Sequence, residues 1–232
     1  MNIISALQTI REGFDFTDLL KLLQSVIPSL ICITLHELCH GLTAYALGDD
    51  TARRAGRLTL NPLKHLDPMG LLMVVVFHFG WAKPVPVNMN AFRHPKRDMA
   101  LTALAGPAGN VLITLVFLLL YGAFYIPLAV SDAGRYVLQM LQLTAYISLG
   151  FAIFNLIPLP PLDGSKVLFA VLSDESYRKL MQYERYGSIL LLVLVASGVL
   201  GTPLSNAVRT AFNALIPLSQ WACDKVYLLF YK

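Results

Sequence analysis

The chain has 232 residues, of which 56% are hydrophobic and 14% charged, and its mean hydropathy is +0.61. Soluble domains contain about 25% charged residues, and a soluble protein of this length lacks the interior to bury so much apolar surface. The composition excludes an ordinary soluble domain and predicts an all-α polytopic membrane protein with about four to six transmembrane helices. The net charge of +4 is explained by the basic loops of a membrane protein, so we expect no nucleic-acid partner.

The N-terminal region combines a polar start with a long apolar run. Residues 1–21 predict an amphipathic segment on the membrane surface, because charged residues interrupt them too often for a signal peptide. Residues 22–47 form the first expected span, which is uncharged through Leu35 and contains ionisable residues thereafter. Ionisable residues are costly inside a membrane and by default indicate function.

Residues 48–97 have a different character, with arginine and lysine residues that mark an aqueous loop. The apolar stretch at residues 68–82 is too short to span a membrane comfortably. It continues into residues 80–87, GWAKPVPV, whose prolines exclude a helix interior. We therefore expect a small membrane-associated β-hairpin or sheet here, covered by protein or lining a wet cavity.

Two further uncharged stretches, residues 99–130 and 136–162, are the second and third expected spans. The second contains small residues suited to close helix contact, namely Ala103, Ala105, Gly106, Ala108 and Gly109. The third ends in prolines that must break the helix, and a short helix is expected at residues 165–172. Residues 189–208 predict another apolar helix and 210–221 a shorter one, so this tail could cross the membrane once or twice.

These elements divide the chain into an amphipathic segment at residues 1–21, a core at residues 22–172 and C-terminal membrane helices at residues 173–232. Basic residues concentrate in the loop after the first span and again two spans later, whereas the opposite loop contributes only Arg135. The positive-inside rule places the basic side in the cytoplasm. The cysteines form no CxxC pair and are interpreted as small buried residues: Cys32, Cys39 and Cys223.

The sequence His36-Glu37-Leu38-Cys39-His40 is an HExxH motif. Residues four apart share a helix face, so both imidazoles can bind one metal while Glu37 holds its water. Zinc suits two imidazoles and a carboxylate with one position left for water, and it lowers the pKa of that water towards about 7. The alternative, two surface histidines on a helix, is disfavoured by the apolar surroundings.

Asp163 is the only carboxylate between Asp132 and Asp174, and it follows the proline-broken span. It is the natural third metal ligand. The alternative is a helix N-cap, for which aspartate is favoured, but the neighbouring prolines indicate a shaped, non-helical stretch that presents side chains. We therefore expect one zinc ion per chain, held by His36, His40 and Asp163.

Together these motifs resemble the site-2 protease family of intramembrane zinc metalloproteases. The resemblance covers about residues 22–172 and rests on the HExxH motif, on residues 155–158 (NLIP) leading to residues 162–164 (LDG), and on residues 105–110 (AGPAGN). Residues 80–90 look like the membrane-associated strand region of compact bacterial members. We do not expect the PDZ domain or the regulatory nucleotide-binding tail of larger relatives.

The resemblance implies that His36, His40 and Asp163 bind zinc, that Glu37 is the general base and that Asn155 assists binding of the substrate or transition state. Chemically, an asparagine side chain can donate a hydrogen bond to a developing oxyanion, and the alternative is a polar contact between helices.

Asn110 has the same two interpretations, of which the structural one is favoured. The remaining histidines are interpreted as surface or interfacial groups, and His94 is the best candidate among them for the mouth of the site: His65, His78 and His94.

The expected function is an endopeptidase in a bacterial cell membrane, with its active site nearer the cytoplasmic face. Its partners are transmembrane or signal-peptide substrates and membrane lipid, and the oligomeric state stays open. The alternatives are a catalytically inactive relative that binds membrane helices and a membrane metal transporter or sensor. The intact Glu37 argues against the first, and candidate ligands at a single depth argue against the second.

Overall fold

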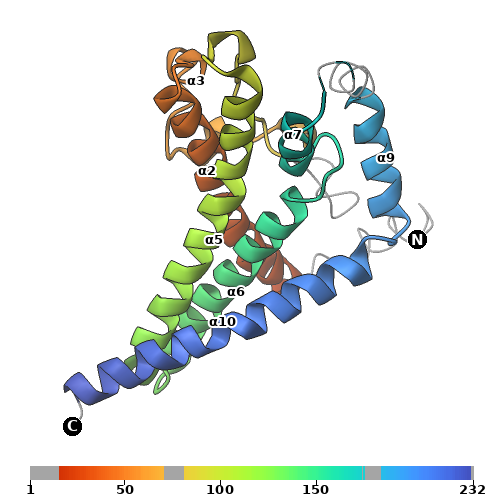
Figure 1. Cartoon of the computed structure of the whole chain (residues 1–232). Coiled ribbons are helices and arrows are strands. Elements are labelled where there is room, and N and C mark those ends of the chain that lie inside the picture. Colours follow the sequence, from red (N-terminus) through yellow and green to blue (C-terminus); the bar gives the residue numbers. More distant parts are fainter. Residues whose placement is uncertain (1–15, 71–80, 174, 176–183, 231–232) are drawn as a thin grey trace.

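The computed structural model describes residues 16–70, 81–173, 175 and 184–230 (Figure 1). The elements in chain order are α2 (Phe16–Ala46), α3 (Thr51–Arg54), η1 (Pro62–Lys64), η2 (Met89–Ala91), α5 (Pro95–Leu128), α6 (Asp132–Asn155), α7 (Asp163–Ala170), α9 (Glu184–Ala196) and α10 (Gly201–Phe230). In the described residues three helices are long and apolar enough to cross a membrane, or four if the pair α9 and α10, bent by 83°, is one span. The chain is thus a mostly helical membrane protein. The three candidate spans fall below the expected four to six, and four would be the lowest number expected.

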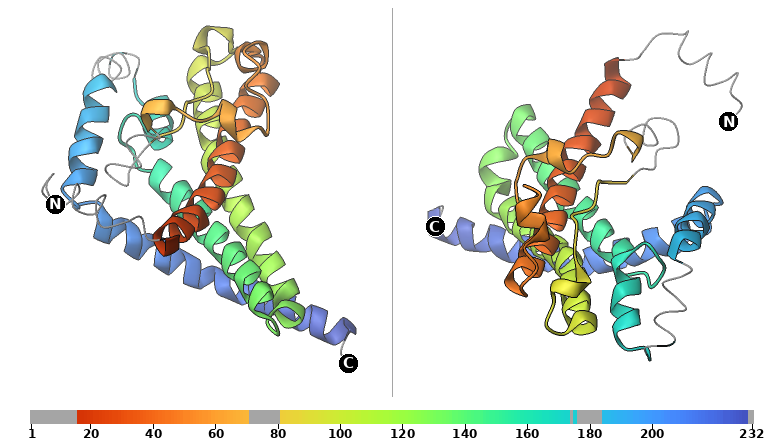
Figure 2. Two further views of the ribbon diagram at one scale, coloured as in Figure 1. Left: turned by 180° about the vertical axis from the view of Figure 1, so that it is seen from behind. Right: turned by 90° about the horizontal axis from the view of Figure 1, so that it is seen from above.

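Helix α5 is the centre of the fold. It packs against α2, α6, α7 and α10, and the views in Figures 1 and 2 agree on this arrangement. Only 22% of its most apolar stretch is buried within the protein, and residues such as Leu112 and Phe124 point outward. Apolar surface exposed to water costs about 25 cal/mol per Å², so this outer surface suits lipid.

Small residues let the helices approach α5 closely, as the sequence predicts for residues 103–109. A Cβ atom at Gly109 would lie 2.5 Å from Cys39 Sγ on α2, and one at Gly122 would lie 2.0 Å from the Ser219 carbonyl oxygen on α10. Ala103 and Gly106 are buried in this surface, whereas Ala108 is exposed. The contact surface is therefore narrower than the run of small residues.

Helix α6 ends at Asn155, earlier than the expected end at residue 162, because the prolines that follow cannot continue the helix. The intervening turn is closed by backbone hydrogen bonds, including one from Leu162 N to Leu159 O of 2.9 Å. The chain re-enters a helix at Asp163, which begins α7. A Cβ atom at Gly164 would lie 2.2 Å from the Leu156 carbonyl oxygen, so glycine is needed where α7 meets the end of α6.

The C-terminal tail departs from the prediction. A helix over residues 189–208 followed by one over 210–221 is wrong, because the break lies at residues 197–200, where Gly198 has φ +74°. From Gly201 the chain forms one helix to Phe230 that continues through Pro217.

Parts of the N-terminal and strand predictions lie outside the described residues. This applies to residues 1–15 of the amphipathic segment and to residues 71–80 of the expected hairpin. Helix α2 begins at Phe16, before the expected start at residue 22. In the part of the chain that the structure describes there is no named strand, and the one antiparallel bridge joins Leu66 and Ala82. The division into three regions stays a prediction.

Candidate metal centre

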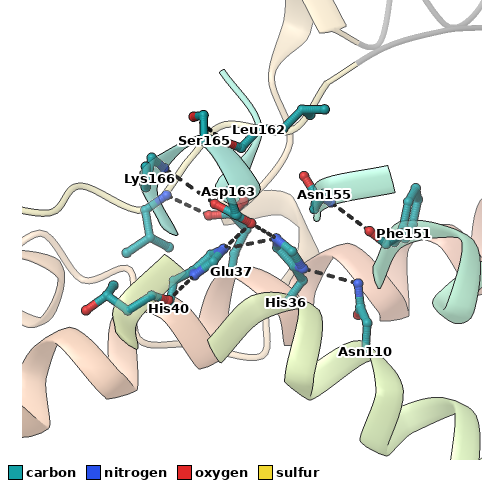
Figure 3. Close-up of polar contacts among 12 residues, drawn as sticks. His36, Glu37, His40, Asn110, Phe151, Asn155, Leu162, Asp163, Ser165 and Lys166 are labelled. Carbon is teal, nitrogen blue, oxygen red and sulfur yellow. Dashed lines mark hydrogen bonds and ion pairs between the residues drawn. The ribbon is translucent and has the colours of Figure 1, made fainter. Parts of the chain in front are cut away.

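His36 and His40 lie one turn apart on α2, and Asp163 is the first residue of α7, so the site joins the first span to the turn after α6 (Figure 3). The Nε2 atoms of the two histidines are 3.0 Å apart, and each lies 3.1 Å from Asp163 Oδ2. All three side chains are buried. Within the described residues these are the histidine, cysteine and acidic side chains grouped closely enough to hold a metal.

The surroundings of His40 favour a cation at the centre of this cluster. His40 Nδ1 lies 2.6 Å from the carbonyl oxygen of Thr102 on α5, and a carbonyl can only accept, so Nδ1 carries the proton. The Nε2 atom of a neutral His40 therefore presents a lone pair to the ionised Asp163 Oδ2, and a cation between the two atoms would stabilise this arrangement. Two imidazole nitrogens and a carboxylate oxygen are a donor set that zinc prefers.

The two oxygen atoms of Asp163 have different partners. Oδ2 faces both histidines, whereas Oδ1 lies 3.4 Å from Lys166 Nζ, one turn along α7 (Figure 3). The alternative of a helix N-cap is not supported, because the side-chain partners of Asp163 in the described structure are the histidines and Lys166.

Glu37 lies beside the ligands on α2 and is half-buried. Its Oε2 accepts a hydrogen bond of 2.7 Å from the backbone N–H of Val85. Val85 belongs to residues 82–88, which lie outside the helices. Pro84 and Pro86 favour an extended backbone in this segment and have no N–H group. The carboxylate of the HExxH motif is thus held in place by the backbone of this segment.

The extended segment is tied down on both sides of Val85. Lys83 N donates to His65 O at 2.9 Å, and Arg57 Nη2 donates to Lys83 O at 2.7 Å. Beyond Val85, Asn88 N donates to Asp49 Oδ2 at 2.6 Å, just past the end of α2. These bonds fix the segment relative to the helix that contains Glu37.

Asp49 is a buried carboxylate outside the spans. Burial opposes its ionisation, but hydrogen bonds from the Thr51 hydroxyl and from the N–H groups of Asn88 and Thr51, together with the charge of Arg54, hold the pKa of Asp49 below its ordinary value. Asp49 is therefore an ionised anchor for the segment that holds Glu37.

Comparison with known proteins places this chain in a family. A Bacillus subtilis protein named "Putative zinc metalloprotease YwhC" is 37% identical over 207 residues, which cover 88% of this chain and 90% of that protein. The family model for peptidase family M50 matches residues 122–200. The chain belongs to peptidase family M50.

Other relatives of this M50 peptidase match a smaller share of the chain. The Rip2 proteins, also named "Putative zinc metalloprotease", are 34% identical over 176 residues in Mycolicibacterium smegmatis and 33% over 170 residues in Mycobacterium tuberculosis H37Rv. These matches cover 74% and 71% of this chain, and 66% and 63% of the relatives. No solved structure matches the chain. The family and the ligand cluster together make the chain a zinc metalloprotease.

Asn155, predicted to assist catalysis, lies at the end of α6 beside the ligand cluster (Figure 3). Its Nδ2 donates to the Phe151 carbonyl oxygen one turn earlier, at 3.0 Å. The amide must leave this bond before it can donate to a substrate. Its catalytic role stays a prediction.

Asn110, for which the sequence favours a structural interpretation, lies at the site. The structure places its side chain against the site, with Nδ2 3.1 Å from His36 Nδ1 (Figure 3). Gly106 lies one turn earlier on the same face of α5, where a Cβ atom would lie 2.4 Å from His40 Nε2. The four-residue spacing of Gly106 and Asn110 was the available signal, because residues so spaced meet the same neighbouring helix.

The other histidines fall in different places. The sequence predicts a surface or interfacial position for His65. A surface position is wrong, because His65 is 1% exposed and its Nε2 lies 2.9 Å from the Thr59 carbonyl oxygen. His78 lies outside the described residues, and His94 is exposed at the start of α5. Among the cysteines only Cys32 is fully buried.

Proposed function

We propose that this M50 peptidase hydrolyses peptide bonds in or near the transmembrane segments of other membrane proteins, either membrane-anchored regulators or signal-peptide remnants. The observation that supports this most is the buried convergence of Asp163 with His36 and His40, which lie in the first candidate membrane span, with Glu37 beside them (Figure 3). A soluble substrate has little access to such a site, whereas a substrate already in the membrane can reach it laterally.

In this proposal His36, His40 and Asp163 hold one zinc ion per chain. Bound zinc supplies a Lewis acid and lowers the pKa of water towards about 7. Glu37 accepts a proton from the attacking water and later delivers it to the leaving amine, as a general base and then acid. The Val85 N–H group keeps the Glu37 carboxylate oriented for both transfers. Asn155 donates to the developing oxyanion once its bond to Phe151 opens.

Residues 82–88 also suit a role in holding the substrate. A peptide bond can be cut only if its carbonyl is free, so a transmembrane helix must be unwound at the cleavage site. An unwound peptide can pair with an exposed strand edge. N–H groups two residues apart in an extended segment point the same way, and in the described part of the chain Val87 N–H has no partner. A peptide paired with the Val87 N–H group would lie on the same side of the segment as Glu37, whose carboxylate accepts the hydrogen bond from Val85 N–H.

The small membrane-associated β-hairpin belongs to the same proposal. Its support is the antiparallel bridge of Leu66 with Ala82 and the adjacent hydrogen bond from Lys83 N to His65 O.

We further propose that the chain resides in a bacterial cell membrane with the site nearer the cytoplasmic face. His40 lies six residues before the end of α2 at Ala46, or about 9 Å at 1.5 Å per residue. The loop beyond this end is rich in arginine and lysine, which the positive-inside rule assigns to the cytoplasm. A cysteine introduced at Ala55 should react with membrane-impermeant reagents only after the cells are opened, and reaction in intact cells would reverse the orientation.

The proposed function is tested by comparing membrane peptides in cells that express the wild type or Glu37→Gln. The substitution keeps the shape of the side chain and removes the base, so membrane-embedded peptides should accumulate only with the variant. Wild-type and variant cells with identical membrane peptides would argue for an inactive helix-binding protein. Zinc flux through liposomes that contain either protein would instead favour a transporter.

A further inference from the structure

Asn110 is fully buried on α5, and its backbone is fixed by hydrogen bonds. Its carbonyl oxygen accepts hydrogen bonds from Thr114 Oγ1 at 2.9 Å and from Ser148 Oγ on α6 at 2.8 Å. The side chain takes part in neither bond and lies against His36 instead, with Nδ2 3.1 Å from His36 Nδ1 (Figure 3). The packing of α5 and α6 thus uses the main chain of Asn110 and leaves its amide for the metal centre.

The orientation of this amide determines which nitrogen of His36 is free. If the NH₂ group donates to Nδ1, the proton of a neutral His36 lies on Nε2, the atom that faces His40 and Asp163. If Oδ1 accepts from Nδ1–H, Nε2 is left with a lone pair that can bind a metal. The two orientations differ by a half-turn of the amide. The amide atom turned away from His36 is buried without a partner among the described residues, so its surroundings favour neither orientation. The orientation of the amide therefore depends on which nitrogen of His36 carries the proton.

We propose that Asn110 is a positioning residue for the metal centre: its Oδ1 accepts the proton of His36 Nδ1 and so presents His36 Nε2 to zinc. The carbonyl oxygen of Thr102 does the same for His40 Nδ1 at 2.6 Å. Both histidines are then oriented by acceptors on α5, one a backbone carbonyl and the other an asparagine amide. Such partners of metal-bound histidines typically contribute about 10–100-fold to metal affinity.

This inference rests on the zinc site and is independent of the proposed substrates. Its test is therefore zinc binding without any substrate, measured by chelator competition on the purified full-length chain in detergent. Asn110→Leu removes the acceptor and keeps the number and branching of the side-chain heavy atoms. Asn110→Asp keeps an oxygen acceptor for His36 Nδ1–H and removes the amide donor. Ser148→Ala is the matched control, because it removes the hydrogen bond to the Asn110 carbonyl oxygen without touching the side chain.

We expect zinc affinity to fall about 10–100-fold in Asn110→Leu, to stay near the wild-type value in Asn110→Asp, and to be unchanged in Ser148→Ala. With cobalt in place of zinc, the visible absorption of a tetrahedral site should be retained in the aspartate variant and altered in the leucine variant. Retained affinity in Asn110→Asp would show that Asn110 acts as an acceptor for His36. A merely structural role would not make the aspartate variant bind zinc more tightly than the leucine variant.

Equal zinc affinity in folded Asn110→Leu and wild type would overturn the proposal. So would an aspartate variant that binds zinc as weakly as the leucine variant, because an acceptor alone would then not suffice. If Asn110→Leu does not fold, Asn110→Ala removes the acceptor without added methyl groups, and its affinity is compared with Asn110→Asp in the same way. Failure of the proposed proteolysis would leave these zinc affinities unchanged, so the two outcomes are distinguishable.

Discussion

The Val85 N–H group donates a hydrogen bond of 2.7 Å to Glu37 Oε2, and this bond links the HExxH helix to an extended segment 48 residues later in the chain. Glu37 is the side chain that the proposed mechanism requires to move protons. The flanking residues Pro84 and Pro86 have no N–H group, so Val85 is the donor that this stretch offers at that point.

Replacing Val85 by proline should slow cleavage without loss of zinc. The substitution deletes the N–H group that orients Glu37, and a hydrogen bond to a charged group contributes about 1.5–3 kcal/mol, or about 10–100-fold in rate. Val85→Thr is the control, because it keeps the N–H group and the shape. The rates are measured on a purified transmembrane peptide at equal zinc content, and a proline variant as fast as the threonine variant would remove Val85 from the account.

Replacing Gly106 by alanine should weaken zinc binding. The added Cβ would lie 2.4 Å from His40 Nε2 and 2.6 Å from His36 Cε1, so the imidazoles or α5 must move. We expect an affinity loss of about 10–100-fold, comparable to other disturbances of the groups that support a metal.

The matched control for Gly106 is Gly150→Ala on α6, where a Cβ would meet no atom within 4 Å. There alanine should leave zinc affinity unchanged and should not lower the melting temperature, because it favours helix over glycine by up to about 1 kcal/mol. Similar zinc affinities in the two variants would show that Gly106 does not make room for the ligands.

Replacing Asp49 by asparagine should destabilise the protein in a pH-dependent way. Since the folded-state pKa of Asp49 is lowered, its contribution to stability is fully present above the unfolded pKa of about 3.9 and is lost as pH falls through the folded pKa. The melting temperature of Asp49→Asn should therefore lie below that of the wild type at neutral pH, and the two should converge in acid.

The control for this pH series is Asp132→Asn, because the Asp132 side chain is 98% exposed. Its melting temperature should follow that of the wild type at every pH. A difference for Asp49→Asn that is independent of pH would mean that shape rather than charge makes Asp49 an anchor.

Substrates should be cut near residues that weaken a helix, such as glycine, proline or asparagine, because their carbonyls must be freed before hydrolysis. Replacing these residues by leucine in a cleaved substrate should lower the cleavage rate more than the binding affinity. Both are measured on the same reconstituted peptide pair. Equally fast cleavage of the strongly helical version would show that unwinding is not limiting.

The sequence was sufficient to predict the group of His36, His40 and Asp163 that the structure brings together, but not the residues that surround this group. His36 and His40 are identified by their spacing on one helix, and Asp163 by its isolation among prolines, because these are properties of local sequence. The partners of these ligands come from α5: the Thr102 carbonyl oxygen and the Asn110 amide. A backbone carbonyl has no sequence signature, and a lone asparagine in a span fits helix packing equally well.

The fold shows the same division between local and long-range information. The prolines after Asn155 ended α6, as their chemistry requires. In the tail, however, Pro217 lies inside α10, and the break falls at Gly198 instead. Which proline or glycine interrupts a helix depends on how that residue packs against other segments. The local sequence alone does not determine this packing.

Zinc content per chain, measured on purified wild type, Asp163→Ala and Glu37→Gln, tests the central claim most directly. The affinity of a protein for zinc depends on the number and geometry of its protein ligands. We expect one zinc per chain in the wild type and in Glu37→Gln, with cleavage reduced in the latter by about 10²–10⁴-fold, and loss of both zinc and cleavage in Asp163→Ala. An Asp163→Ala protein that retains one zinc per chain and cleaves at the wild-type rate would contradict the proposed metal centre.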